Sequence, residues 1–498
     1  MRKCGRVTEI AATPAAARAR VAVSGLVVAA TLALAAVVDV LWRLPFLRFP
    51  ITEDEAGYIG VARIWDRGGS LYHDAWADRP QGLLLVFRGL LHVDGGSTTA
   101  IRAAAICAGL ALLALIALIA YEVGGRRLMV TVTLLTAAFG CSPYVQSFTL
   151  SGELLASVPA AASMYCVLRY FRRERLWWLA VAGVLSGCAV MVKQSAFDAA
   201  LAAVAFLVLT QRRRAITPVV TLVAAAIVPV AAAALAAHSL SDWWFAVVGY
   251  RGVDSLVTHS PLVVLSRLVF SLAAVAKGLA LLVVLALRGR PKAPRLLRLW
   301  LAAALVGVIG GGDFWAHYYQ QLVPPLALLA GIGLLRLVDE RPRALEWGPT
   351  IVAAVLMVVV IPPAYSGSLD QRVRAVLPDD RQLTSEAAIG DYVRAHTAAA
   401  DQVLVIPPLA SIYYRSRRAP ALRFLWGQPA AAIPAAREEL VNVLETRRAA
   451  LVVEYLKPNV LDATGRADAA LKRNYRRVAT LPTGDPSVPR AVFLRPRH

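Results

Sequence analysis

The first 365 residues consist mainly of long apolar runs that alternate with short polar connections. Each run is close to the ~20 residues that a helix needs to cross the hydrocarbon core of a bilayer. The pattern therefore predicts a polytopic α-helical membrane protein with about eleven spans. The predicted spans cover residues 21–42, 98–121, 127–145, 152–170, 176–192, 196–210, 215–237, 262–287, 298–312, 318–337 and 348–364.

The pattern changes after about residue 366, where the apolar stretches become shorter and charged residues separate them. Residues 387–396 have the periodicity of an amphipathic helix. Short apolar runs at 402–406, 449–454 and 492–494 predict strands. We therefore divide the chain into a transmembrane domain, 1–365, and a small C-terminal α/β domain, 366–498, which is long enough to bury a core.

The composition agrees with a membrane protein. Of the 498 residues 58% are hydrophobic, the mean hydropathy is +0.59, and only 17% are charged, against about 25% in soluble proteins. The net charge of +21 would suit a nucleic-acid binder, but the arginines lie between the apolar runs and not on one polar domain. Nucleic acid is therefore not an expected partner. The five cysteines have no paired or metal-type spacing, so neither disulfides nor a zinc site is predicted.

Basic residues gather on alternate connections, at 2–20, 126–127, 169–175, 212–214, 288–298 and 336–343. The positive-inside rule places these connections and the N-terminus in the cytoplasm. The loop over residues 43–97 and, after an odd number of spans, the C-terminal domain then lie outside the plasma (inner) membrane. The apolar run from Val21 is too long for the core of a signal peptide, so we expect it to be retained as the first span.

Three consecutive acids, Glu53, Asp54 and Glu55, stand just beyond the first span. Adjacent carboxylates repel one another, so a solvated surface rarely gains from such a cluster. Beside a membrane they suit a general base or the ligands of a metal ion. An alternative of equal weight is that they solvate a loop or cap a helix that begins near Ala56.

Further polar residues lie at membrane depth on the same outer side of the predicted bundle. Glu153 starts the fourth span, Lys193 ends the fifth, and residues 311–321 join the ninth and tenth. Charges at this depth are costly, so each of them taken alone favours snorkelling to the interface. Their joint occurrence on the side of the three acids favours a shared external cavity.

The basic and hydrogen-bonding residues of this predicted cavity suit an anionic ligand. Arg79 and Lys193 would hold a phosphate. His317, with Tyr318 or Tyr319, would donate hydrogen bonds to it.

Together these motifs resemble those of the bacterial GT-C glycosyltransferases, in the branch of the protein mannosyltransferases and lipid A aminoarabinose transferases. The resemblance rests on Asp54-Glu55, Ala56-x-Tyr58, Arg79-Pro80, Glu153, Lys193-Gln194, His317-Tyr-Tyr with Pro324-Pro325, and, as in actinobacterial members, residues 401–406, 412–414 and 417–420. Two positions depart from the family pattern. Gln81 follows Arg79-Pro80 where a second proline is usual, and Asp313 stands ahead of the His-Tyr pair where a basic residue is frequent.

The resemblance implies an inverting glycosyltransferase, hexosyl or pentosyl, in the membrane. Its donor would be a sugar linked to a polyprenyl phosphate, and its acceptor an extracytoplasmic polysaccharide of the cell wall, a glycolipid or a protein. Asp54 would act as general base, Glu55 would orient it or bind the acceptor, and Glu153 would be the second acid. No cofactor is implied with certainty, and a divalent cation would lie between Asp54 and Glu153.

The resemblance also implies the substrate-binding residues. The lipid phosphate would be held by Arg79 and Lys193, while His317, Tyr319 and Tyr58 would line the same site. The composition suits a high-GC actinobacterium, in which decaprenyl-phosphate sugars would be plausible donors.

The alternative class is a transporter or lipid flippase for a cell-envelope precursor, because polytopic chains with charges at membrane depth also move substrates. Such proteins often contain inverted repeats with matching Gly/Pro-interrupted spans, and the sequence shows neither. The polar residues also gather on one side, whereas a translocation path needs them on both. The sequence therefore favours the glycosyltransferase.

Overall fold

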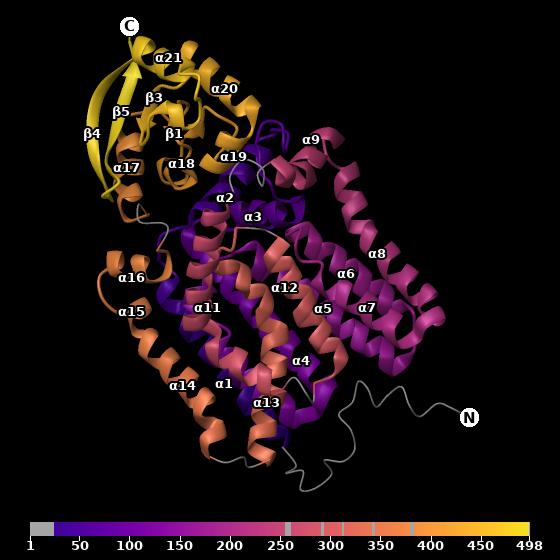
Figure 1. Ribbon diagram of the computed structural model, residues 1–498. Coiled ribbons are helices and arrows are strands. Elements are labelled where there is room, and N and C mark those ends of the chain that lie inside the picture. The colour runs from indigo at the N-terminus through magenta and orange to yellow at the C-terminus, as the bar shows by residue number, and fades with distance from the viewer. Residues whose placement is uncertain are drawn as a thin grey trace.

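The computed structural model describes residues 24–253, 260–289, 293–310, 313–340, 344–378 and 383–497. Long helices form a bundle, and a smaller domain with a β-sheet lies at one end of it (Figure 1). The basic stretch at residues 2–20, on which part of the predicted orientation depends, lies outside the described residues. The predicted fold class, a polytopic helical protein with a small C-terminal α/β domain, is confirmed.

Within the described residues, each predicted span falls on helix. The helices are α1 (Gly25–Arg43), α4 (Thr98–Phe139), α5 (Gly152–Arg173), α6 (Trp177–Val192), α7 (Asp198–Gln211), α8 (Ile216–Leu235), α11 (Pro261–Gly289), α12 (Arg295–Gly310), α13 (Val323–Glu340) and α14 (Ala344–Val360). Helix α4 contains two of the predicted spans. Gly125, with φ 73°, interrupts the helical geometry between them. Seven helical segments of the described chain are long and apolar enough to cross a bilayer. Two of them, with 42 and 38 residues, are long enough to cross it twice.

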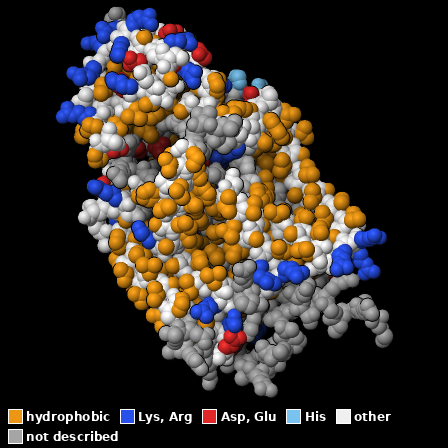
Figure 2. Space-filling view, in the orientation of Figure 1, with side chains coloured by type: hydrophobic (Ala, Val, Ile, Leu, Met, Phe, Trp, Pro, Cys, Tyr) orange, Lys and Arg blue, Asp and Glu red, His pale blue; other side chains and the backbone are white. Residues whose placement is uncertain are grey.

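The surface of the bundle is apolar over a broad band in Figure 2. Large side chains that face outwards here include Val220 and Ile227 of α8 and Val352 and Val358 of α14, each more than half exposed. Soluble proteins rarely expose so continuous an apolar surface, whereas lipid tails cover it without cost. Exposed arginines at 172–175 and 212–214 lie at the end of the bundle away from the sheet domain.

Two shorter helices, α2 (Glu53–Asp66) and α3 (Gln81–Asp94), lie between the bundle and the sheet domain (Figure 1). Thr52 caps α2: its hydroxyl accepts from the amide of Glu55, whose side chain in turn accepts from the amide of Thr52. This reciprocal capping box fixes the start of the helix at Glu53, three residues before the predicted start near Ala56. Gly95, in the left-handed conformation with φ 58°, ends α3.

The C-terminal domain contains a five-stranded mixed sheet. Its strands are β1 (Gln402–Ile406), β2 (Ala419–Pro420), β3 (Leu451–Glu454), β4 (Tyr475–Asp485) and β5 (Val488–Pro496), in the order β2-β1-β3-β5-β4. Strands β2, β1 and β3 are parallel, and β5 and β4 add to them antiparallel. Helices α17 (Leu383–Ala395), α18 (Ala410–Ser416), α19 (Gly427–Ala432), α20 (Pro434–Glu445) and α21 (Arg466–Asn474) complete the domain.

The three predicted strands coincide with β1, β3 and β5, and the predicted helix at 387–396 with α17. Strands β2 and β4 were not predicted. Strand β2 has only two residues, and the exposed edge strand β4 carries charged residues where a buried strand would be apolar. One continuous set of buried apolar side chains runs from the bundle through α2 into this domain, so the two parts pack as one body.

Candidate active site

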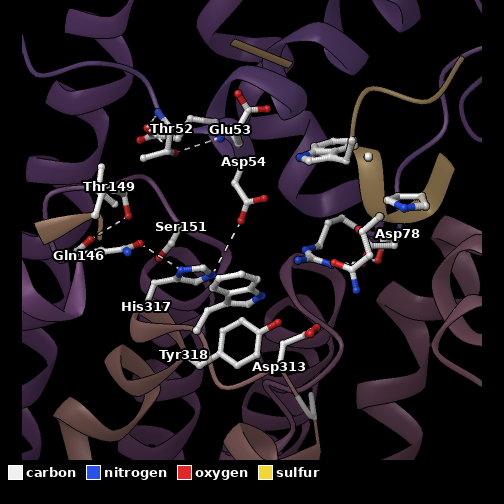
Figure 3. Close-up of a pocket in the computed structure, with 18 of the residues that line it drawn as sticks. Thr52, Glu53, Asp54, Asp78, Gln146, Thr149, Ser151, Asp313, His317 and Tyr318 are labelled. Carbon is white, nitrogen blue, oxygen red and sulfur yellow. Dashed lines mark hydrogen bonds and ion pairs between the residues drawn. The ribbon is translucent and has the colours of Figure 1, made fainter. Parts of the chain in front are cut away.

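A cavity of 250 Å³ lies where the bundle, α2 and the C-terminal domain meet. Its walls come from the first turn of α2, Asp78-Arg79, the connection before α5, Tyr250-Arg251, the segment from Asp313 to Tyr318, and Trp426–Pro429 of the C-terminal domain. Figure 3 shows these side chains converging from segments that are far apart in the sequence. Of the residues predicted to share a cavity, the three acids, Arg79, Asp313 and His317 line this pocket, whereas Glu153 and Lys193 do not.

The three consecutive acids of α2 point in three different directions, because successive residues of a helix are turned by about 100°. Glu55 points into the bundle, where it is 1% exposed. Its carboxylate forms an ion pair with Arg102, accepts from the amide of Leu150 at 2.8 Å and closes the capping box with Thr52. These contacts occupy the side chain fully, so the structure gives Glu55 an anchoring position instead of the predicted contact with the acceptor or with Asp54.

Glu53 points the opposite way, towards the C-terminal domain. Its two carboxylate oxygens accept from the amides of Ala410 at 2.6 Å and Ser411 at 3.3 Å. Burial raises the pKa of Glu53, an effect that these hydrogen bonds oppose and neighbouring Asp54 reinforces. Glu53 is therefore held by backbone from a different domain.

Asp54, between the two anchors, points into the cavity towards His317 (Figure 3). Its side chain is 39% exposed, and its oxygen Oδ2 lies 3.8 Å from Nε2 of His317. The same Nε2 atom lies 3.8 Å from Oε1 of Glu153, which is 2% exposed. His317 thus stands between an accessible carboxylate and a buried one.

The ring of His317 is oriented by two neighbours. Its Nδ1 atom lies 3.1 Å from the side-chain oxygen of Gln146, which directs Nε2 towards the carboxylates. The ring of Tyr318 meets it edge to face at 5.1 Å. Both His317 and Tyr318 belong to the 3₁₀ helix η7 (Ala316–Leu322), which precedes α13. The imidazole is therefore held with its Nε2 atom facing both carboxylates, 3.8 Å from each.

Tyr319 does not line the cavity. In a 3₁₀ helix adjacent residues are turned by about 120°, so only one of the two tyrosines can share the face of His317. That residue is Tyr318, whereas the hydroxyl of Tyr319 lies 2.8 Å from that of Ser271 on α11. The predicted site residue Tyr319 is therefore replaced by Tyr318.

The positive charges on the cavity wall are Arg79, as predicted, and Arg251, which was not predicted. Both guanidinium groups form ion pairs with the carboxylate of Asp78. Burial alone would raise the pKa of Asp78, but the two arginines hold it below its ordinary value. The phenol of Tyr58 lies behind Arg79 and accepts from its Nε at 3.2 Å. Tyr58 therefore positions Arg79, and is buried at 2% exposure.

Lys193 lies one layer behind the cavity wall. It is 7% exposed, forms an ion pair with Glu153, and its ammonium lies 3.8 Å from the centre of the Tyr318 ring. Lys193 is thus not part of the cavity wall, and its predicted contact with a phosphate stays a prediction. Its position suits a different task, which is to neutralise the buried charge of Glu153.

The residues predicted to bind a divalent cation do not form a ligand set. Lys193 already occupies Glu153, and His317 stands between Glu153 and Asp54. Across the described ranges, no group of three or more His, Cys, Asp and Glu side chains is arranged to hold a metal ion.

The structure also explains the unusual Asp313. This residue is 3% exposed and forms an ion pair with Arg267 of α11. Arg267 in turn lies over the ring of Trp315, at 5.1 Å from its centre. Arg267 of α11 thus places a basic group beside Asp313, just ahead of the His-Tyr pair in sequence.

Comparison with known proteins agrees with this architecture. A model of the dolichyl-phosphate-mannose-protein mannosyltransferase family matches residues 78–238. The structure resembles ArnT from Cupriavidus metallidurans, with a TM-score of 0.62 in the apo state and 0.59 when bound to undecaprenyl phosphate, at 14% identity over 94% of this chain and 97% of ArnT. It also resembles the oligosaccharyltransferase of Archaeoglobus fulgidus in complex with Zn and sulfate, with a TM-score of 0.54 at 13% identity, over 93% of this chain and 72% of that one. None of the curated proteins matches the sequence significantly.

At these identities the likeness to solved structures establishes the fold alone, which is that of ArnT and of the Archaeoglobus fulgidus oligosaccharyltransferase. The predicted resemblance is thus confirmed for the fold over nearly the whole chain and for the sequence over residues 78–238. The matched stretch includes Arg79, Glu153 and Lys193.

Proposed function

We propose that this protein is an inverting glycosyltransferase that moves a sugar from a polyprenyl phosphate to an acceptor hydroxyl at the outer face of the plasma membrane. One observation carries the proposal. Among the cavity-lining carboxylates of the described chain, Asp54 combines exposure to the cavity with a neighbour, His317, that is neither arginine nor lysine. The other acids are held by ion pairs or backbone amides.

Asp54 acts as the general base. A base must reach the proton it removes, and the side chain of Asp54 is accessible from the cavity. It accepts the proton of the acceptor hydroxyl as the oxygen attacks the anomeric carbon. The bond from this carbon to the phosphate oxygen breaks on the opposite face, so the configuration inverts. His317 then receives the proton on its Nε2, and the neighbouring carboxylates of Asp54 and Glu153 stabilise the resulting imidazolium.

The leaving phosphate needs positive charge and not a proton donor, because it departs as a stable anion. Arg79 and Arg251 supply this charge at the cavity wall. Guanidinium groups bind phosphate in a bidentate manner, which also orients it. That ArnT has been crystallised with undecaprenyl phosphate supports a lipid phosphate as the ligand.

The other two acids that were predicted to be catalytic, Glu55 and Glu153, hold the site in place and do not react. Glu55 fixes the start of α2 to the bundle through Arg102, and Glu153 with Lys193 forms a neutral buried pair that supports His317. Exposed arginines at the far end of the bundle support a cytoplasmic location for that end, and hence an external one for the cavity.

The proposal is tested with purified protein in proteoliposomes that contain one radiolabelled polyprenyl-phosphate sugar at a time. Membrane extract supplies polysaccharide, glycolipid and protein acceptors. Transfer of label from one donor, with inversion at the anomeric carbon, is the expected result. Movement of the intact labelled lipid between leaflets without transfer would instead support the transporter or flippase.

A further inference from the structure

Glu53 links the reactive end of α2 to the C-terminal domain. Both of its carboxylate oxygens accept from backbone amides of that domain, at 2.6 Å from Ala410 and 3.3 Å from Ser411. Charged acceptors form stronger hydrogen bonds with amides than neutral ones do. The residue that follows in the chain is Asp54, so this link is one peptide bond away from the proposed base.

The same face of α2 remains in contact with the C-terminal domain over the next two turns. Gly57 and Gly60 follow Glu53 at the i+4 and i+7 positions and therefore share its face. A methyl group at Gly57 would overlap the indole of Trp426, and one at Gly60 would lie 2.8 Å from the side chain of Leu425. The helix and the domain thus approach as closely as glycine permits.

The first turn of α2 is consequently held from two sides. Glu55 ties it to the bundle through Arg102 and Leu150, and Glu53 ties it to the C-terminal domain. Loss of one tie permits the turn to rotate. A carboxylate lies roughly 5 to 6 Å from the helix axis, so a rotation of about 10° moves it by about 1 Å. Displacements of this size reduce catalytic rates by about 100-fold.

We propose that Glu53 is a positioning residue, through which the C-terminal domain fixes the carboxylate of Asp54 against His317. The inference rests on the proposed function for the role of Asp54. It gives the C-terminal domain a direct part in the chemistry, because the domain determines where the base lies.

The C-terminal domain should remain attached when Glu53 is removed, because other contacts hold it, so the effect of the substitution on catalysis can be measured. Arg423 donates to the carbonyl of His73 and accepts from the amide of Trp76, each at 3.2 Å. The hydroxyl of Tyr414 donates to the carbonyl of Gly96 at 3.1 Å. These contacts hold the domain to the loops around α2 and α3 independently of Glu53.

The test compares Glu53→Ala and Glu53→Gln with a control, Glu445→Gln, at an exposed acid of α20. Glu53→Ala should lower kcat by about 10- to 100-fold with KM for donor and acceptor unchanged. Glu53→Gln should recover most of this loss, since its amide oxygen still accepts from Ala410 or Ser411. Gly57→Ala, whose methyl group would push α2 away from Trp426 of the C-terminal domain, should lower kcat without removing any charge.

A second measurement needs no activity. Amide hydrogen exchange should become faster in residues 53–58 and 410–416 of Glu53→Ala, and remain unchanged in Glu445→Gln. Wild-type kcat in Glu53→Ala, a raised acceptor KM with unchanged kcat, or unaltered exchange in 53–58 would each overturn the inference. Activity in Asp54→Asn would contradict the proposed function, whereas an inactive Asp54→Asn with a fully active Glu53→Ala would contradict only the inference.

Discussion

Oδ2 of Asp54 lies 3.8 Å from Nε2 of His317, although the two residues are far apart in the sequence. One belongs to the first turn of α2 and the other to the 3₁₀ helix before α13. The same nitrogen is equally distant from Glu153, so the imidazole connects a solvent-accessible carboxylate with a buried one. In the proposed mechanism, the imidazole can therefore receive the proton that Asp54 takes from an acceptor.

Arg251 should matter for the donor. Removing this guanidinium in Arg251→Ala deletes a charged hydrogen-bond donor, worth about 1.5 to 3 kcal/mol, and should raise the donor KM by about 10-fold or more. Steady-state kinetics with varied donor checks the effect. The acceptor KM should not change, nor should either constant in Arg476→Ala, at an exposed arginine of β4. An unchanged donor KM would remove Arg251 from the phosphate site.

Glu55 should matter for stability. Glu55→Ala leaves Arg102 buried without its partner, which costs about 3 to 5 kcal/mol in comparable cases. The melting temperature in detergent should therefore fall by several degrees. The matched control is Asp339→Ala, which breaks a pair with Arg127 whose side chains are 52% and 41% exposed and whose loss costs about 0 to 1 kcal/mol. A Glu55→Ala variant that is fully stable but inactive would instead indicate that Glu55 takes part in catalysis.

The adjacent tyrosines of η7 should respond differently to the same substitution. Tyr318→Leu removes the ring that contacts both His317 and Lys193, so kcat should fall by about 10-fold. Tyr319→Leu removes a hydroxyl that hydrogen-bonds to Ser271, and should lower stability without lowering kcat. Kinetics and thermal unfolding of the two variants separate the effects, and equal losses of kcat would contradict the assigned faces.

The pH dependence of stability should report the state of Glu53. Burial raises its pKa above the value in the unfolded chain, so the folded protein binds the proton more tightly. Stability from this group is therefore greatest at low pH and is lost as the pH rises through the raised pKa. Glu53→Gln cannot titrate, so the melting temperature of the wild type should fall relative to this variant as the pH rises from about 4, where an unperturbed glutamate titrates, through the raised pKa of Glu53. A constant difference, or one of opposite sign, would contradict the assignment.

The membrane helices could be predicted because the bilayer imposes one length and one composition on every span. The approximate location of the cavity could be predicted, because charged residues at membrane depth are costly and usually face a cavity or each other. The direction in which each side chain points could not be predicted. Glu53, Asp54 and Glu55 are alike in sequence, and their separate roles follow from the helix start at Thr52 and from partners such as Arg102 that lie far along the chain.

Arg251 was missed for a related reason. Nothing in the sequence around Arg251 singles it out, and its place on the cavity wall follows from the pairing with Asp78 in three dimensions. Tyr318 and Tyr319 could not be distinguished because the choice depends on the 3₁₀ geometry of η7. Strand β2 is too short to give a sequence signal.

The central claim is that Asp54 is the base of a glycosyl transfer. The most direct test measures transfer from the accepted polyprenyl-phosphate sugar by wild-type protein, Asp54→Asn and the control Glu445→Gln in the same proteoliposomes. Asparagine keeps the size of the side chain but cannot take a proton, so transfer should fall by about 100-fold or more while the melting temperature stays near that of the wild type. Transfer at the wild-type rate in Asp54→Asn would contradict the claim.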